Sequence, residues 1–398
     1  MSCFSGIPPA PSDSIFGLMA QYHQDSRSCK VDLTAGIYKN ESLKTPILKV
    51  VKQIESHLLT QEGNKEYLPI EGDKRYLELV SEMVFGKTLS SVLSECISGF
   101  QTVGGTGALR IAGEFIKHHI GEKVYVSDPS WPNHRGVFSQ AGLTVGHYPY
   151  YNRNTNGINF TQMEQFLKQL PPKSVVLLHA GCHNPTGKDL SHAEWEMIYH
   201  ICREGQLIPF FDAAYLGFHG TPEEDAYPIR LFAKKGIEMM VAVSFSKTFS
   251  LYGERIGALF VLSASGVMAN NITSQIKIII RRNYSNPPMH GMHIVAGILN
   301  DPLLKAGWLG ELAQMRERIA SMKKQFSLQI SSKVVNKDYT YLQDAKGMFC
   351  FCSLDPEAVE RLKREYAVYM TEDSRVNLAG LIPSNIDYVV DSIAKVIG

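Results

Sequence analysis

The stretch VSFSKTFSLYGERIG, residues 243–257, decides more about this protein than any other part of its sequence. It places Lys247 shortly after an apolar run, Met239–Val243, that is typical of a buried strand. Hydroxyl side chains flank the lysine, and Arg255 follows it in the same stretch. Apolar surroundings favour the neutral amine of a lysine, which is the form that makes a Schiff base. Hydroxyl groups and a guanidinium bind a phosphate dianion. The stretch therefore predicts a lysine that reacts with a phosphorylated cofactor at the end of a strand.

Outward from this stretch, between about residues 45 and 300, short runs rich in β-branched residues alternate with longer segments of helical periodicity. Continuous apolar strands between amphipathic helices indicate a mostly parallel sheet covered on both faces. We therefore predict the α/β class, with a large three-layer domain and a smaller α+β domain. The expected strands are Val124–Ser127, Val175–His179, Ile208–Phe211, Met240–Ser244 and Gly257–Leu262, and the expected helices include Thr106–His119, Thr161–Gln169, His192–Glu204 and Tyr227–Lys235.

The character of the sequence changes after Asp301. A long charged helix, roughly Leu309–Ser327, precedes short elements such as a strand in Met348–Ser353 and a helix in Asp355–Glu365. We expect residues 306–398 to form the second part of the small domain and residues 13–45 its first part, with the large cofactor-binding domain at 46–305. Residues 1–12 contain several prolines and predict an extended arm.

The composition is that of an ordinary soluble globular protein, with 44% hydrophobic and 20% charged residues in 398 and a net charge of +1. The absence of a basic block argues against nucleic-acid binding, and every apolar run is too short to span a membrane. We expect no signal peptide. The seven cysteines are odd in number and form no CxxC pair, which indicates reduced thiols in a cytoplasmic protein without a metal site.

Four of the expected strands end in clusters of polar side chains. The clusters follow Val124–Val126, Val175–Leu178, Ile208–Phe211 and Met240–Val243. Ligands of open α/β sheets bind outside the carboxyl ends of the strands, so we expect the four clusters to share one rim. The side chains brought to this rim are Trp131, Asn184, Asp212, Tyr215 and Lys247.

Pyridoxal phosphate fits these groups part by part. Its aldehyde needs a lysine, and its pyridine nitrogen needs a buried carboxylate that keeps it protonated, which suits Asp212. Asn184 and Tyr215 are candidates to donate to the ring oxygen, and Trp131 is a candidate to stack on the ring. Taken alone, Asp212 could equally cap a helix, and a lone tryptophan is usually a core residue. The presence of Lys247 favours the cofactor.

A glycine-rich turn supplies a further phosphate contact. Gly104, Gly105 and Thr106 precede a helical run, and the free N–H groups at the start of a helix bind anions. The turn lacks the third glycine of a dinucleotide-binding fingerprint and the Lys-Ser/Thr pair of a Walker loop. By itself such a turn is a weak signal, and Arg255 taken alone could form a surface salt bridge with Glu254.

Several motifs follow one another in a fixed order along the whole chain. They are Gly36–Lys39 (GIYK), Gly104–Arg110 (GGTGALR), Pro129–His134 (PSWPNH), His183–Gly187 (HNPTG), Ser246–Lys247 through Arg255, Asn283–Pro288 (NYSNPP) and Arg375–Asn377 (RVN). With these motifs the chain resembles the aspartate aminotransferases of the fold-type I pyridoxal-phosphate enzymes, in the subgroup that also holds bacterial aromatic aminotransferases. The likeness runs from Pro11 to the last helix.

The resemblance implies a homodimer with shared active sites, in which each subunit has a large cofactor domain and a small domain that closes on substrate. Lys247 would hold pyridoxal phosphate as a Schiff base and then move a proton between the substrate and the cofactor. Asp212, supported by His134, would pair with the pyridinium. Tyr67 would reach the phosphate held by the neighbouring subunit. The residues that would bind phosphate within the subunit are Gly105, Thr106, Ser244, Ser246 and Arg255.

The resemblance also assigns the substrate contacts. Arg375 would clamp the α-carboxylate bidentately, near Asn184 and the backbone of Gly36. Arg281, from across the dimer interface, would bind the distal carboxylate, which favours aspartate and glutamate. Tyr38 would stand close to the reactive lysine. Taken alone, both arginines could instead be ordinary surface cations.

The predicted reaction is a ping-pong transamination that moves the amino group of L-aspartate to 2-oxoglutarate, giving oxaloacetate and L-glutamate. An aromatic amino acid aminotransferase is the alternative, because the distal arginine can swing away and leave an apolar wall for an aromatic ring. A pyridoxal-phosphate lyase or decarboxylase fits less well, because the chain is close to minimal length. A non-enzymatic regulator also fits less well, because no DNA-binding appendage is visible and every position expected to take part in the chemistry holds a suitable residue. Arg282 and Glu66 depart from the usual pattern beside the distal site.

Overall fold

The computed structural model describes residues 2–335 and 337–397. Its centre is a seven-stranded sheet in the order β2-β10-β9-β8-β7-β3-β4. In this sheet β10 runs antiparallel to β2 and β9, and the remaining neighbours are parallel, which confirms the predicted mostly parallel sheet. The strands are β2 (Ile97–Val103), β3 (Lys123–Asp128), β4 (Thr144–Pro149), β7 (Val175–His179), β8 (Ile208–Ala213), β9 (Met239–Ser244) and β10 (Ile256–Leu262).

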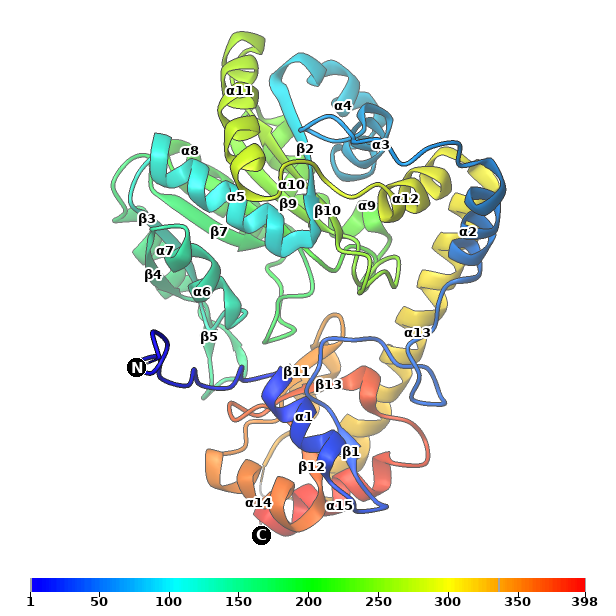
Figure 1. Cartoon of the computed structure of the whole chain (residues 1–398). Coiled ribbons are helices and arrows are strands. Elements are labelled where there is room, and N and C mark those ends of the chain that lie inside the picture. Colours follow the sequence, from blue (N-terminus) through cyan, green and yellow to red (C-terminus); the bar gives the residue numbers. More distant parts are fainter. Residues whose placement is uncertain (1, 336, 398) are drawn as a thin grey trace.

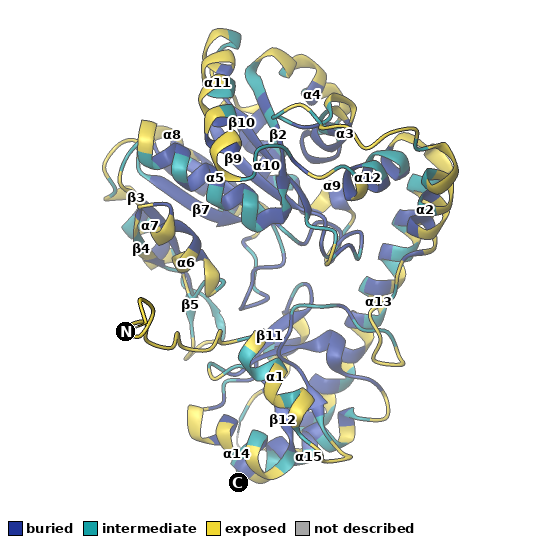
Figure 2. Cartoon of the chain, in the orientation of Figure 1, coloured by how far each residue is buried: buried dark blue, intermediate teal, exposed yellow. Residues whose placement is uncertain are grey.

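Helices cover both faces of this sheet because both faces are apolar. In β9, Met240 and Ala242 pack into one hydrophobic cluster with α5 and α11, whereas Val241 and Val243 pack into another with α3, α8 and α10. The central strands β9 and β10 are accordingly buried from end to end between the helices (Figure 2). The helices around the sheet are α2 (Lys49–Gln61), α3 (Lys74–Phe85), α4 (Lys87–Val92), α5 (Gly104–His119), α6 (Asn133–Gln140), α7 (Phe160–Lys168), α8 (His192–Glu204), α9 (Pro222–Asp225), α10 (Tyr227–Lys234), α11 (Gly266–Asn283) and α12 (His290–Asn300).

A second group of elements brings the two ends of the chain together, and we call it the terminal lobe; the sheet with its helices is the sheet lobe. Strand β1 near the N-terminus pairs with β12 near the C-terminus, through Val31 and Val368. The long helix α13 (Pro302–Lys333) runs from the sheet lobe into the terminal lobe (Figure 1). The elements of the terminal lobe are α1 (Phe16–Gln24), β1 (Val31–Asp32), the 3₁₀ helix η2 (Thr340–Asp344), β11 (Phe349–Phe351), α14 (Pro356–Tyr366), β12 (Val368–Tyr369), β13 (Arg375–Asn377), the 3₁₀ helix η3 (Leu378–Gly380) and α15 (Ile386–Ile397). The predicted domain boundaries stay a prediction.

The structure contains a longer helix and additional strands beyond those that the sequence pattern predicted. Helix α13 is longer than the predicted segment, because Asp301 accepts hydrogen bonds from the N–H groups of Leu303 and Leu304 and so starts the helix earlier. Strands β2 and β4 were not predicted. Both lie at the edges of the sheet, where partial exposure interrupts the apolar pattern.

A short hairpin of β5 (Tyr151–Asn152) and β6 (Gly157–Ile158) and the 3₁₀ helix η1 (Ser94–Cys96) complete the elements. Across the described residues, no helix is both long enough and apolar enough to cross a membrane.

Candidate active site

A cavity of about 510 Å³ lies at the carboxyl ends of β7, β8 and β9, between the two lobes. This is the edge of a parallel sheet at which ligands bind. Most of the residues singled out in the sequence line it. They are Gly36, Gly105, Thr106, Trp131, Asn184, Asp212, Tyr215, Ser244, Ser246, Lys247, Arg255 and Arg375.

Lys247 follows β9 and projects into this cavity, with its amine nitrogen 5.0 Å from the centre of the Tyr215 ring. The pKa of Lys247 is lowered to about 8, mainly by burial; the carboxylate of Asp212 acts in the opposite direction, and the guanidinium of Arg255 adds a smaller lowering. A lysine with this pKa has a substantial neutral fraction near physiological pH. The amine is therefore prepared to act as a nucleophile and as a base.

Asp212 lies next to the last residue of β8 and lines the same cavity, and no helix begins beside it, so the capping alternative is wrong. Its Oδ2 lies 3.0 Å from Nε2 of the fully buried His134. Burial alone would raise the pKa of Asp212, but the hydrogen bond from His134, with smaller electrostatic contributions from neighbouring groups, lowers it below its usual value. An ionised carboxylate in a buried cavity is suited to pair with a cation.

His179, to which the sequence analysis gave no role, continues this hydrogen-bonded chain. Its Nδ1 accepts a hydrogen bond from the backbone N–H of Asn184 at 3.4 Å, and burial lowers its pKa to about 3. The neutral ring must therefore carry its proton on Nε2, which is 3.4 Å from Oγ of Ser130. Ser130 can then donate to Nδ1 of His134 at 2.8 Å, which leaves Nε2 of His134 to donate to Asp212. A polar residue directly after an apolar strand was the signal for His179.

An anion-binding cradle forms where α5 begins. The first turn contains Gly104 and Gly105, and a Cβ built on Gly105 would lie 2.9 Å from Cβ of Ser244. Arg255 borders the same place, with its Nη1 donating to Oγ of Ser246 at 3.2 Å. The long helix α5 directs its positive end and its free N–H groups toward the cradle. A side chain on Gly105 would clash with Ser244, and the absence of a side chain leaves the backbone N–H groups accessible to a phosphate.

Arg375 lies in β13 of the terminal lobe and is 2% exposed, so the alternative of a surface ion pair is wrong. Its Nη1 donates to Oδ1 of Asn184 at 3.0 Å and its Nη2 donates to the carbonyl of Thr34 at 2.7 Å. The guanidinium lies over the ring of Phe349, 4.5 Å from its centre. Its Nε is buried without a hydrogen-bond partner among the described residues, which leaves a donor for a carboxylate.

Four of the predicted residues do not line the cavity, and one of them, His134, lies behind Asp212. Tyr38 is buried, and its backbone N–H donates to Oη of Tyr252, a cavity residue that the sequence analysis missed. Tyr67 is 90% exposed, and Arg281 is exposed at the end of α11, where it donates to Ser285. The expected place of Tyr67 and Arg281, in the site of a neighbouring subunit, stays a prediction.

This arrangement fits pyridoxal phosphate. It combines an amine of lowered pKa, an ionised carboxylate, an anion cradle and the indole of Trp131 along one wall. In the part of the chain that the structure describes, no group of three or more histidine, cysteine, aspartate or glutamate side chains could hold a metal ion.

Known proteins resemble this chain over its full length. The family model of aminotransferase class I and II matches residues 28–393. The aromatic-amino-acid aminotransferase of Escherichia coli is 40% identical over 395 residues, covering 99% of this chain and 100% of that protein. An aspartate aminotransferase of Pseudomonas aeruginosa is 39% identical over 398 residues and covers 100% of both chains.

Solved structures agree with this likeness. The aromatic-amino-acid aminotransferase of Burkholderia pseudomallei, covalently bound to pyridoxal phosphate, has a TM-score of 0.96, 40% identity and 100% coverage of both chains. The aspartate aminotransferase from the cytoplasm of Saccharomyces cerevisiae has a TM-score of 0.95 and 32% identity, with 99% of this chain and 98% of that chain covered. Family, fold and site chemistry lead to one conclusion: this chain belongs to the class I and II aminotransferases and is a pyridoxal-phosphate-dependent transaminase.

Proposed function

We propose that the protein moves the amino group of L-aspartate to 2-oxoglutarate, giving oxaloacetate and L-glutamate by ping-pong transamination. The observation that carries the proposal is the meeting of Lys247, Asp212 and the buried Arg375 around one cavity. Full-length relatives named aspartate aminotransferase support the choice of substrate.

Lys247 is the residue to which we assign the Schiff base with the cofactor. When bound, pyridoxal phosphate supplies an electron sink that stabilises negative charge at the substrate carbon. Asp212, with His134 behind it, would keep the ring nitrogen protonated, because an ionised carboxylate favours the cation beside it. Asn184 and Tyr215 would donate to the ring oxygen. The phosphate would be held by Gly105, Thr106, Ser244, Ser246 and Arg255, and Trp131 would stack on the ring.

Substrate binding rests on the arginine of the terminal lobe. Arg375 would hold the α-carboxylate through its fork of N–H groups, with Asn184 and Gly36 beside it, and so orient the Cα–H bond toward Lys247. The free amine of Lys247 would remove the proton from Cα of the substrate and return it to C4′ of the cofactor. Its lowered pKa suits this exchange, because an acid–base group works best near the ambient pH. Tyr38 would support the site from behind Tyr252.

A homodimer follows from the same assignment. Tyr67 and Arg281 lie outside the cavity of their own chain, so we assign them to the phosphate and to the distal carboxylate in the partner subunit's site. Phe4 and Ile7 in the predicted arm are 75% and 69% exposed, and a partner chain would cover such apolar side chains. The seven free cysteines and a cytoplasmic relative from rice support a cytoplasmic location.

Aromatic amino acids are the second candidate substrates, and one feature of the cavity favours them. Helix α1 contributes the apolar side chains of Phe16 and Met19 to the wall, and Ile15, directly before this helix, contributes a third. An aromatic side chain would bury its ring against this wall without needing a distal cation. Relatives named for aromatic amino acids support this reading.

The experiment is a pair of half-reactions followed by visible absorbance. Adding L-aspartate to the cofactor-loaded protein should convert its absorption to that of the pyridoxamine form, with oxaloacetate as the product. Lys247→Ala should bind the cofactor without a covalent bond and lose nearly all turnover. Release of alanine and carbon dioxide, or of ammonia, would assign the protein to decarboxylases or lyases. No spectral change with aspartate or tyrosine would refute the proposal.

A further inference from the structure

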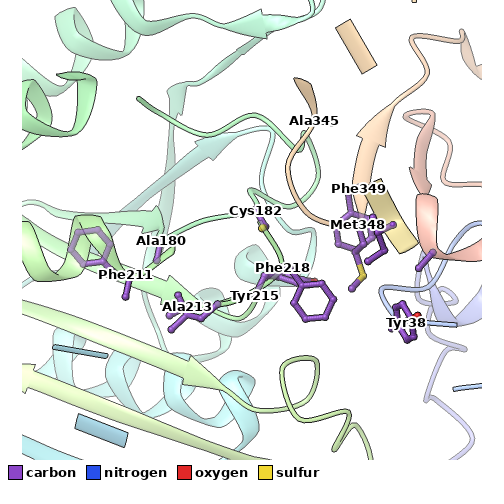
Figure 3. Close-up of a cluster of buried hydrophobic side chains, with 14 of the residues drawn as sticks. Tyr38, Ala180, Cys182, Phe211, Ala213, Tyr215, Phe218, Ala345, Met348 and Phe349 are labelled. Carbon is purple, nitrogen blue, oxygen red and sulfur yellow. The ribbon is translucent and has the colours of Figure 1, made fainter. Parts of the chain in front are cut away.

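The loop that carries Asn184 is joined to the terminal lobe at its far end. The backbone N–H of Lys346 donates to the carbonyl of Gly187 at 2.6 Å. Gly187 is packed against the same segment, since a Cβ built on it would lie 2.2 Å from the carbonyl oxygen of Phe349. In Figure 3, Ala345, Met348 and Phe349 face Cys182 of this loop across a buried apolar cluster. The two lobes therefore touch backbone to backbone beside the site.

Lys188, the residue that follows Gly187, spans the same junction with its side chain. Its Nζ donates to the carbonyl of Tyr341 at 2.8 Å, and its side chain is 13% exposed. The carboxylate of Asp344 is 4.0 Å away but 81% exposed, so this ion pair contributes little. The hydrogen bond to the carbonyl is partly buried and charge-assisted, and it is the stronger contact. The backbone of Lys188 is fixed as well, because its carbonyl accepts from Oη of Tyr150 at 2.7 Å.

The segment held by Lys188 leads directly to the substrate arginine. The 3₁₀ helix η2, which contains Tyr341, precedes β11, and β11 pairs with β13, where Phe351 is opposite Arg375. Phe349 in β11 lies under the Arg375 guanidinium. From the other direction, Arg375 donates to Asn184. Asn184 and Arg375 are thus linked twice, by one direct hydrogen bond and by a path through Lys188, η2 and the two strands.

We propose that Lys188 is a positioning residue that holds the terminal lobe against the Asn184 loop and thereby sets the place of Arg375 for the α-carboxylate of every substrate. This inference rests on the proposed role of Arg375. The α-carboxylate is common to all amino acid and 2-oxo acid substrates, so the effect is the same for aspartate and for aromatic amino acids. In this it differs from a residue that binds the substrate side chain, which discriminates between them.

Two variants test the role of the side chain. Lys188→Met keeps the length and apolar stem of the side chain but removes the donor, and we expect KM for L-aspartate and L-tyrosine to rise by the same factor, about fivefold, with kcat nearly unchanged. Lys188→Arg keeps a cationic donor and should restore KM to near the wild-type value. Equal KM values in Lys188→Met and wild type, or equal defects in both variants, would overturn the proposal, and so would a change confined to one substrate.

A control separates positioning from loss of stability. Arg230 also joins a partly buried cation to backbone carbonyls, donating to those of Val84 and Met83 at 3.1 and 2.8 Å, but it does so within the sheet lobe. Arg230→Met should lower the unfolding temperature and leave KM unchanged. A parallel rise of KM in this control would mean that any weakened fold has the effect, and would overturn the assignment to Lys188.

Hydrogen exchange measured by mass spectrometry supplies a readout that does not depend on activity. Peptides covering residues 340–349 should exchange faster in Lys188→Met than in wild type or Lys188→Arg, because the junction that protects the Lys346 amide is loosened. Unchanged exchange would overturn the inference even in a fully active enzyme. A wild-type protein without transaminase activity would instead refute the proposed function, and the exchange result would still decide whether Lys188 holds the junction.

Discussion

Gly104→Ala should weaken cofactor binding through a single methyl group. Gly104 has a φ of +67°, a left-handed conformation that costs a residue with a Cβ about 1–2 kcal/mol. The added Cβ would lie 2.5 Å from Nη2 and 2.9 Å from Cζ of Arg255, so the guanidinium must move away from the cradle. If one charge-assisted hydrogen bond to phosphate is lost, worth about 1.5–3 kcal/mol, cofactor affinity falls roughly ten- to a hundredfold.

The measurement is a titration of cofactor-free protein with pyridoxal phosphate, followed by absorbance. Gly236→Ala is the matched control, because Gly236 has a φ of +71° and no atom within 4 Å of the added Cβ. It carries the same backbone strain without the displacement of Arg255. A Gly104→Ala protein whose cofactor affinity equals that of this control would show that Arg255 does not bind the phosphate.

The remaining predictions concern the distal arginine and the reactive lysine. Arg281→Ala should lower kcat/KM for L-aspartate by roughly a hundredfold or more and leave L-tyrosine nearly unaffected, because only the dicarboxylate loses an ionic partner; steady-state kinetics with both substrates checks this, and an equal loss for both would remove Arg281 as the selector. Burial lowers the pKa of Lys247 from 10.5 to about 8, so between these values the folded cofactor-free protein binds fewer protons than the unfolded chain. Its free energy of unfolding relative to the Lys247→Met variant should therefore rise with pH from 8 to 10.5, by at most about 1.4 kcal/mol per pH unit, and be flat below pH 8. Urea unfolding of the two proteins at several pH values measures this difference, and a difference that falls with pH contradicts a buried amine.

The chemistry of the site was predictable wherever a polar residue stands at the end of an apolar run or shortly after it. Lys247 and Asp212 gave this signal at the ends of β9 and β8, and the structure places both at one cavity. His179 gave the same signal at the end of β7, but its role depends on Ser130 and on the N–H of Asn184, which are distant in sequence or belong to the backbone. Hydrogen-bond direction is a property of the assembled network.

The local sequence did not predict the strands at the edges of the sheet, which have a neighbouring strand on one side only. The edge strands β2 and β4 mix polar and apolar residues, since partial exposure tolerates both. Gly104 and Gly105 looked like a turn, yet they form the first turn of α5, where Arg255 and Ser244 leave no room for a side chain.

The reactive groups, and the strand end that carries each of them, could be identified without the fold, because apolar runs, their polar ends and the order of the motifs are local properties of the chain. The burial of Arg375, its hydrogen bonds to Asn184 and Thr34, and the bond by which Lys188 joins the loop of Asn184 to the segment leading to Arg375 depend on the folded arrangement. These contacts join residues more than a hundred positions apart, and they exist because the two ends of the chain fold together into one lobe and pack against the rim of the sheet.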